Sequence, residues 1–106
     1  VLALCSDEMI DRQIDINLKG TVFLTKAAIR LMLAKRSGKI INISSMNSFR
    51  PLTKIPAYSA AKASINNLTQ WLAVHFAKVN IRVNAIAPGF FITKQNNPSV
   101  RVEIFC

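Results

Sequence analysis

The sequence predicts an α/β protein, specifically a helix–strand–helix–strand slice of a larger doubly wound fold with a parallel sheet. Two segments with helical spacing of apolar residues, 6–36 and 56–78, alternate with two short apolar segments, 39–45 and 81–87. Strands joined by so long a crossover pair in parallel. Because two strands do not form a stable sheet alone, residues 1–106 are expected to be a single partial domain of a longer chain.

The first predicted helix begins at Ser6 and ends near Arg36. Ser6 is a typical N-cap residue, and two acidic residues follow it where the helix dipole favours negative charge. Asn17 and Gly20 do not fit a plain helix, because asparagine is a poor helix former and glycine costs about 1 kcal/mol relative to alanine. Either residue is expected to mark a site or a close contact. Ser37–Gly38 is predicted to end the helix.

The second half of the chain is predicted to hold one strand–helix–strand unit. The strand at 39–45 lacks strict alternation, as is typical when both faces of a sheet are covered. Pro56 suits the first turn of the second helix, and Asn80 can take the left-handed conformation that ends it. The strand at 81–87 alternates apolar and polar residues, and Pro88–Gly89 breaks it.

The net charge of +9 comes from 14 Lys and Arg against 5 Asp and Glu. Such an excess of positive charge is typical of proteins that bind nucleic acid. However, the densest basic group, Lys35, Arg36 and Lys39, lies where a helix end favours cations, and no aromatic residues interleave with it. We therefore expect no nucleic-acid partner, since a missing acidic part of the chain explains the imbalance equally well. Apolar runs are short, so no membrane partner is expected either.

The cysteines and the single histidine do not indicate a metal site. Cys5 and Cys106 stand at opposite ends of the chain, and His75 does not complete a zinc site with them at any usual spacing. Reduced thiols in a cytoplasmic protein are the expectation. His75 is expected on a helix surface or interface, because no serine–acid pair accompanies it as in a hydrolase. Trp71 is expected to pack between helices.

Three groups of residues are predicted to meet at the carboxyl edge of the sheet, where open α/β sheets bind ligands. Ser44–Ser45 ends the first strand, and Pro88–Gly89 ends the second. Tyr58 and Lys62, at positions i and i+4, share one face of the second helix. An ammonium group beside a tyrosine favours the phenolate, which suits the tyrosine to proton transfer. An isolated pair with this spacing is more often an ordinary surface pair. The surrounding sequence must therefore show whether this pair is catalytic.

The sequence around this pair resembles that of the short-chain dehydrogenase/reductase family. The segment Tyr58–Lys62 (YSAAK), preceded by Ser45 thirteen residues earlier, is similar to the signature of the family. Three further segments resemble family motifs in the correct order: 16–20 (INLKG), 38–45 (GKIINISS) and 81–93 (IRVNAIAPGFFIT). The resemblance implies a Rossmann-like fold, NAD or NADP as cofactor, and hydride transfer between the nicotinamide and a carbonyl or secondary alcohol.

The resemblance also implies roles for individual residues. Tyr58 would exchange a proton with the substrate oxygen, Lys62 would bind the nicotinamide ribose, and Ser45 would orient the substrate oxygen. Asn17 would complete the catalytic set by holding a helix kink and a water in the proton relay. The cofactor-binding residues implied are Tyr58, Lys62, Pro88, Gly89, Phe91 and Thr93. The substrate-pocket candidates are Ser45, Met46, Asn47 and Phe90.

The chain departs from the family pattern in three respects. The glycine-rich phosphate loop has no counterpart, because the only glycines are Gly20, Gly38 and Gly89. The residue that selects NAD over NADP is also absent, so the sequence leaves that choice open. The tail 98–106 does not resemble the usual continuation. The isolated fragment is therefore expected to be inactive, which keeps open a second hypothesis, a non-catalytic binding module.

The substrate predicted is a sugar acid. The segments 45–57 and 70–76 resemble family members of the D-mannonate oxidoreductase (fructuronate reductase) type. Polar residues that suit a polyhydroxy acid flank the expected site: Asn47, Ser48, Arg50, Lys54, Lys94, Gln95 and Asn96. They are equally consistent with a solvated loop. The alternative is a 3-ketoacyl-carrier-protein reductase, whose basic surface would dock an acidic carrier. The resemblance also implies a dimer or tetramer built through the two long helices.

Overall fold

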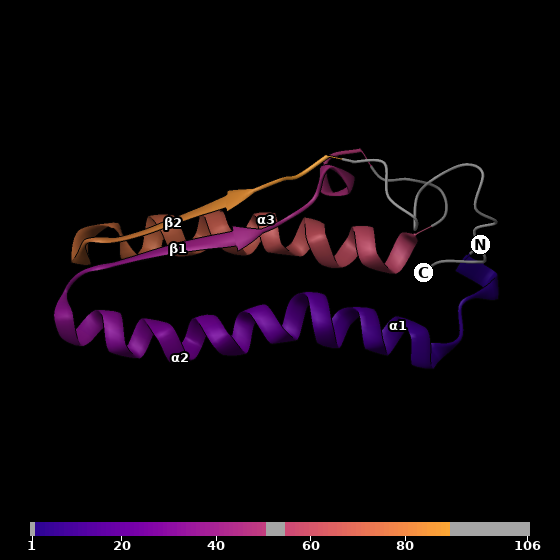
Figure 1. The fold of residues 1–106 in the computed structure, drawn as a ribbon, viewed down its shortest axis with the longest axis horizontal. Helices are drawn as coiled ribbons and strands as arrows, with labels where there is room; N and C mark the ends of the chain where they lie inside the picture. The colour runs from indigo at the N-terminus through magenta and orange to yellow at the C-terminus, as the bar shows by residue number, and fades with distance from the viewer. Residues whose placement is uncertain (1, 51–54, 90–106) are drawn as a thin grey trace.

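The computed structural model describes residues 2–50 and 55–89, and these form two long helical segments that pack on one face of a two-stranded sheet (Figure 1). The elements follow in the order η1 (Leu2–Leu4), α1 (Asp7–Ile14), η2 (Asp15–Lys19), α2 (Gly20–Lys35), β1 (Gly38–Ile43), η3 (Met46–Ser48), α3 (Pro56–Phe76), η4 (Ala77–Val79) and β2 (Ile81–Ile86). Helix α2 contacts β1, α3 contacts β2, and α1 and η2 contact α3.

The sheet confirms the predicted parallel pairing. Strands β1 and β2 pair in register from Gly38 opposite Ile81 to Ile43 opposite Ile86. Ser44 extends the ladder, since its backbone N–H donates to the carbonyl of Ile86 at 2.7 Å. Both strands therefore end at the same edge of the sheet, and the segments that follow them begin side by side.

The first long helix is confirmed, but it is not regular. The Ser6 hydroxyl accepts a hydrogen bond from the Met9 N–H at 3.2 Å, as expected of an N-cap. The backbone then widens into a π-helical turn at Asp15–Lys19, the segment that contains Asn17. The two residues that fitted a plain helix poorly, Asn17 and Gly20, thus lie within this turn and directly after it.

The end of this helix differs from the prediction. Arg36, not a residue of Ser37–Gly38, adopts the left-handed conformation that ends α2, with φ of 52°. Gly38 instead begins β1, and a Cβ at Gly38 would lie 2.9 Å from the Cβ of Met32. The glycine is therefore needed for the close approach of α2 and β1, and not for a left-handed cap.

The second crossover agrees closely with the prediction. Pro56 stands in the first turn of α3, and Asn80 is left-handed with φ of 62° just before β2. Strand β1 ends at Ile43, so Ser44–Ser45 lies beyond it, and a short 3-10 helix, η3, replaces part of the predicted loop. Predictions that fall on residues 51–54 and 90–106, including Lys54, the loop from residue 90 and the tail, lie outside the described residues.

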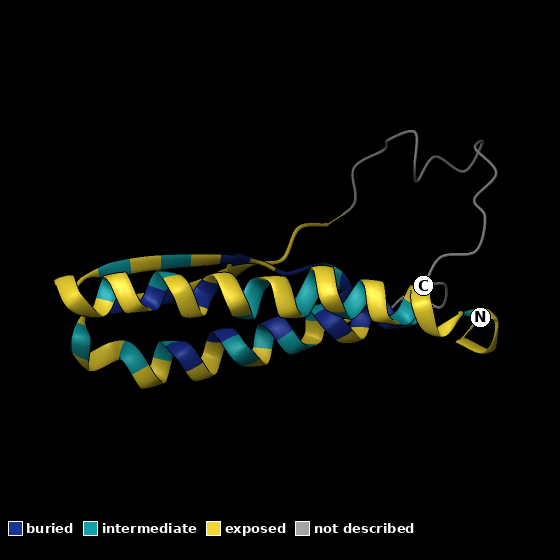
Figure 2. Ribbon diagram, turned by 90° about the horizontal axis from the view of Figure 1, so that it is seen from below, coloured by how far each residue is buried: buried dark blue, intermediate teal, exposed yellow. Residues whose placement is uncertain are grey.

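The core lies between the helices and one face of the sheet. Its buried centre consists of Ile29, Leu72, Ile81 and Val83. The other face of the sheet carries Ile41, Ile43 and Ile86, which are 62%, 56% and 52% exposed. Exposed positions also follow the outer sides of the long helices (Figure 2). The described residues thus bury one face of the sheet and leave the second face, with its three isoleucines, open.

The sequence also led to expectations about membrane spans, metal sites and cysteines. Within the described residues no helix is long and apolar enough to cross a membrane, and the same part of the chain holds no cluster of side chains suited to a metal ion. Cys5 takes part in a disulfide, so the expectation of a reduced thiol at that position is wrong. The other cysteine, Cys106, lies outside the described residues.

The open apolar face predicts that the isolated 106-residue chain packs loosely. Burying only one face of a two-stranded sheet gives little hydrophobic stabilisation against the entropy of ordering the chain. We expect strong far-UV helical dichroism, weak near-UV dichroism and a several-fold rise in fluorescence of the dye ANS, as in molten states.

Replacing Ile41 and Ile43 with threonine should lower the dye fluorescence, because these residues lie on the open face. Replacing the partly buried Ile40 with threonine is the matched control and should not lower it. A cooperative thermal transition without dye binding would contradict this prediction.

Candidate active site

The carboxyl edge of the sheet brings three segments together. The turn after β1 carries Ser44 and Ser45, and the segment after β2 carries Pro88 and Gly89. The Met46 N–H donates to the Pro88 carbonyl at 3.1 Å, which holds the two segments side by side. The first turns of α3 lie at the same end of the molecule (Figure 1). The predicted meeting of these segments is thus seen in the structure.

Lys62 connects helix α3 to the end of β1. Its Nζ donates to the carbonyl oxygen of Ile43, the last residue of β1, at 2.8 Å. The same Nζ lies 5.7 Å from the centre of the Tyr58 ring, one helical turn earlier. Partial burial of the ammonium group lowers the pKa of Lys62 below its ordinary value of 10.5. A cation is therefore held beside the tyrosine at the edge of the sheet.

Ser45 is buried two residues after the end of β1, the strand that Lys62 contacts. Its hydroxyl oxygen caps η3 by accepting a hydrogen bond from the Asn47 N–H at 3.2 Å. A serine hydroxyl has one donor and two acceptor positions. Because the backbone N–H occupies an acceptor position, the hydroxyl proton is left available to donate elsewhere.

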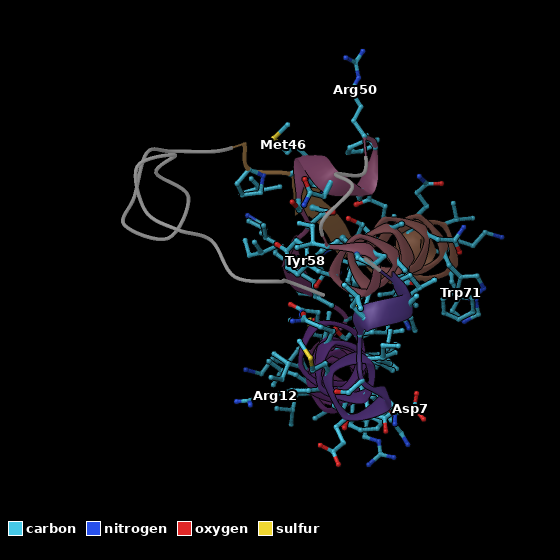
Figure 3. All side chains as sticks on the ribbon, turned by 90° about the vertical axis from the view of Figure 1, so that its right-hand side faces the viewer. Asp7, Arg12, Met46, Arg50, Tyr58 and Trp71 are labelled. Atoms are coloured by element: carbon cyan, nitrogen blue, oxygen red, sulfur yellow. The ribbon has the colours of Figure 1, made fainter. Side chains whose placement is uncertain are left out.

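Tyr58 and Lys62 are half-buried, and the tyrosine lies on the side of α3 that faces the sheet (Figure 3). The i, i+4 spacing places both side chains on one helix face. Chemically, the edge brings together a phenol, an ammonium group and a serine hydroxyl. This set can transfer a proton to or from an oxygen atom and can hold that oxygen in place.

Asn17 lies in the π-helical turn η2, which packs against α3. Its side-chain Nδ2 donates to Oε1 of Gln13 at 2.8 Å. In the described part of the chain Asn17 makes no hydrogen bond to Ser45, Tyr58 or Lys62. The structure therefore brings Asn17 to the helix that carries Tyr58, but by packing and not by a polar contact.

The predicted cofactor and substrate residues fall into three groups. Met46 is half-buried, Pro88 and Gly89 are exposed, and a Cβ built on Gly89 would lie 3.8 Å from Sδ of Met46. Asn47 is only 2% exposed, and its side-chain atoms have no hydrogen-bond partner among the described residues. Figure 3 shows Arg50 pointing away from the molecule. Phe90, Phe91, Thr93, Lys94, Gln95 and Asn96 lie outside the described residues.

Two residues without a sequence-based structural role, Ser48 and Asn66, connect the serine turn to α3. The side-chain Nδ2 of Asn66 donates to the Ser48 hydroxyl at 2.6 Å. Asn66 follows Lys62 by four residues and Tyr58 by eight, so helical spacing alone indicates that it shares their face. Ser48 gave no such signal, because its position depends on the unpredicted helix η3.

A surface hollow of about 420 Å³ lies away from this edge, on the outer face of α3. Trp71 and His75 stack there with ring centres 4.5 Å apart. Trp71 lies on the opposite side of α3 from Tyr58 (Figure 3). His75 is exposed, in agreement with the expectation of a surface residue. The hollow is not part of the candidate active site.

Comparison with known proteins identifies close relatives. The family model described as short chain dehydrogenase matches residues 1–103. An uncharacterised oxidoreductase of Haemophilus influenzae is 60% identical over 82 residues, which cover 77% of this chain and 29% of that protein. An uncharacterised oxidoreductase of Bacillus subtilis is 57% identical over 81 residues, which cover 76% of this chain and 29% of that protein.

Solved structures agree with the described fold. A Haemophilus protein provisionally named D-mannonate oxidoreductase, with bound NAD, has 53% identity and a TM-score of 0.80, covering 89% of this chain and 34% of that chain. A gluconate 5-dehydrogenase from Burkholderia cenocepacia, in complex with NADP and tartrate, has 32% identity and a TM-score of 0.85, covering 91% and 38%. The predicted α/β class is thereby confirmed.

The chain spans 29% of the length of the two curated relatives named above. Its parallel strands, its serine turn and its Tyr–Lys helix lie in the part of the sequence that the family model covers. On these grounds the chain belongs to the short-chain dehydrogenase family.

Proposed function

We propose that this chain forms the catalytic half of an NAD(P)-dependent oxidoreductase that transfers hydride between a nicotinamide and a carbonyl or secondary alcohol. One observation carries the proposal. The Lys62 ammonium bridges from α3 to the Ile43 carbonyl at 2.8 Å, beside the Tyr58 ring and two residues before Ser45. An isolated surface pair would not be tied to the strand end that carries the serine.

In the proposed mechanism the nicotinamide supplies or accepts the hydride when it is bound. The Ser45 hydroxyl donates a hydrogen bond to the substrate oxygen, since its own oxygen accepts from the Asn47 N–H. The Tyr58 hydroxyl gives a proton to that oxygen in reduction and takes it back in oxidation. The Lys62 ammonium stabilises the negative charge that remains on Tyr58 after the proton leaves. Asn17 supports the proton path from the π-helical turn.

The described residues fit the nicotinamide half of such a cofactor. Lys62 supplies a cationic donor, and the exposed Pro88–Gly89 segment lies beside Met46, with a Cβ built on Gly89 3.8 Å from the Met46 sulfur. Tyr58, Lys62, Pro88 and Gly89 would hold this half, and Phe91 and Thr93 are proposed from the motif alone. Several structural neighbours contain bound NAD or NADP, which supports either cofactor. No residue of this chain is assigned to the pyrophosphate.

We propose a sugar acid as the substrate, with Ser45 and Met46 lining its pocket. The similarity to a protein provisionally named D-mannonate oxidoreductase, at 53% identity, supports this class. Asn47 and Phe90 remain sequence-based candidates for the same pocket. A 3-ketoacyl-carrier-protein reductase is the alternative: the 3-oxoacyl-[acyl-carrier protein] reductase from Brucella melitensis has 33% identity and a TM-score of 0.81. The net charge of +9 favours docking of an acidic carrier.

We also propose that the full-length protein is a homo-oligomer that pairs through its two long helices. Helix α2 exposes Phe23, Leu24 and Leu31, and α3 exposes Trp71 and Val74. Exposed apolar side chains of this size are typical of protein–protein interfaces.

The cytoplasmic location expected from the sequence stays a prediction.

The proton-transfer role of Tyr58 is testable in a full-length enzyme. This chain can replace the matching segment of the Haemophilus influenzae relative, with which it shares 60% identity; we call the product the reconstituted enzyme. Tyr58→Phe should lower kcat by about 10²- to 10⁴-fold, because the proton donor is lost. Cofactor affinity, measured by fluorescence titration, should stay within about twofold, since the ring and Lys62 remain.

Lys62→Ala should damage both kcat and cofactor affinity, because the proposal gives Lys62 two contacts. Lys78→Ala is the matched control, since Lys78 is an exposed lysine on η4 at the far end of α3. Substantial turnover by Tyr58→Phe would exclude the proton-transfer role.

The titration of Lys62 gives a second prediction. Desolvation lowers its pKa, so the ¹³C resonance of its reductively methylated amine should titrate with a midpoint below 10.5. Lys62→Gln identifies the resonance by removing it. Above the lowered pKa and up to 10.5 the unfolded chain binds more protons than the folded one, so the contribution of Lys62 to the free energy of unfolding rises with pH across this window. A midpoint at or above 10.5 would contradict the partial burial of the ammonium group.

The substrate class is tested by a panel of assays on the reconstituted enzyme, with the unaltered relative as control. NADH and NADPH oxidation is followed with fructuronate, 2-keto- and 5-ketogluconate, and acetoacetyl thioesters. We expect the highest kcat/KM with a sugar acid. A preference for the thioester of about tenfold, or about 1.4 kcal/mol of transition-state stabilisation, would favour the carrier-protein reductase instead.

A further inference from the structure

The Ser48 hydroxyl stands at the centre of a group of polar contacts beside Ser45. It donates to the backbone carbonyl of Ser45 at 2.6 Å. It accepts from Nδ2 of Asn66 at 2.6 Å and lies 3.2 Å from the Ser44 hydroxyl. When the single Ser44 proton is directed at Ser48, the one donor and two acceptor positions of the Ser48 hydroxyl are all used. A fully satisfied hydroxyl of this kind fixes the groups around it more firmly than a single contact does.

These contacts join two segments that are distant in the sequence. Ser44, Ser45 and Ser48 belong to the turn after β1, and Asn66 belongs to α3, eighteen residues after Ser48. The Ser44 hydroxyl also lies 3.4 Å from the carbonyl oxygen of Lys62. The turn that carries Ser45 is thus attached to α3 along the same stretch that carries Tyr58 and Lys62.

We propose that Ser48 and Asn66 are positioning residues for Ser45. This inference rests on the proposed function of Ser45. By holding the Ser45 carbonyl from one side and α3 from the other, the Ser48 hydroxyl fixes the distance between the serine turn and the tyrosine helix. A misplacement of about 1 Å in a catalytic group can cost about 10²-fold in rate. The pair Ser48–Asn66 therefore acts on catalysis through Ser45 and makes no contact with the reacting atoms.

A second polar pair in the structure provides a matched comparison. Nδ2 of Asn42 donates to the Thr69 hydroxyl at 3.1 Å, and this buried pair also joins β1 to α3. It lies farther from the edge, because Asn42 precedes Ser45 by three residues and Thr69 follows Asn66 by three. If such contacts only stabilise the fold, loss of either pair should have the same effect on kcat. If Ser48 positions Ser45, loss of the Ser48–Asn66 pair should lower kcat more than loss of the Asn42–Thr69 pair.

The test is a double-mutant cycle in the reconstituted enzyme, with Ser48→Ala made in the unaltered and in the Ser45→Ala backgrounds. We expect Ser48→Ala to lower kcat by at least tenfold in the unaltered background and by less than about twofold in Ser45→Ala, with cofactor affinity unchanged. Ser48→Thr keeps a hydroxyl and should retain most of the activity. Thr69→Val should lower the melting temperature while kcat at 25 °C stays within about threefold.

The outcomes separate this inference from the proposed function. If Ser45→Ala itself leaves kcat unchanged, the proposed role of Ser45 fails, and this inference fails with it. If Ser45→Ala lowers kcat but Ser48→Ala has no effect, or has an equal effect in both backgrounds, only the positioning role is overturned.

A second variant covers the case in which Ser48→Ala does not fold. Asn66→Ala removes the other end of the contact, from a half-buried position on α3. The neighbouring exposed residue provides its control, Asn67→Ala. The proposal requires the Asn66 variant, and not the Asn67 variant, to lose at least tenfold in kcat and to show no further loss in the Ser45→Ala background.

Discussion

The hydrogen bond from the Lys62 ammonium to the Ile43 carbonyl is the contact on which the rest of the edge depends. It joins the first turns of α3 to the last residue of β1, and it sets the cation beside the Tyr58 ring. Partial burial makes the charged form of Lys62 less favourable, as its lowered pKa indicates. A charge-assisted hydrogen bond to a backbone carbonyl offsets part of that cost. The strand end and the helix therefore form one unit, which neither segment could provide alone.

At the same edge, backbone and side-chain hydrogen bonds together position the serine turn. Backbone bonds set the strand ends, because Ser44 donates to Ile86 and Met46 donates to Pro88. Side-chain bonds then attach the serine turn to α3 through Ser48. The short 3-10 helix between them is what brings the Ser48 hydroxyl back to the Ser45 carbonyl. A more extended loop would leave Ser45 held by its strand alone.

Local chemistry made several features of the fold predictable from the sequence. Ser6 and Asn80 act through their own side chain or backbone preference, so the N-cap and the left-handed turn were predicted correctly. Arg36 was not, because arginine has no preference of its own for the left-handed conformation that it adopts. The candidate pair Tyr58 and Lys62 was predicted from helical spacing together with the family motif that contains it. Ser48 was not, because its contact with Asn66 is tertiary and depends on a helix of three residues.

Geometry and stability have different sources in this segment. The polar contacts that position Ser45 and Lys62 join residues eighteen or nineteen apart, so closing the loops between them costs less entropy than a more distant contact would, by about 0.6 kcal/mol for each halving of loop length. The strand–helix unit can therefore encode the arrangement of its phenol, ammonium and hydroxyl groups within a short stretch of sequence. Local contacts do not bury the apolar side chains of Ile41, Ile43 and Ile86. Their face of the sheet is left uncovered by the described residues. Hydrophobic burial is the dominant favourable contribution to folding, so burial of these isoleucines would govern how firmly the site is held, whereas the local contacts determine its shape.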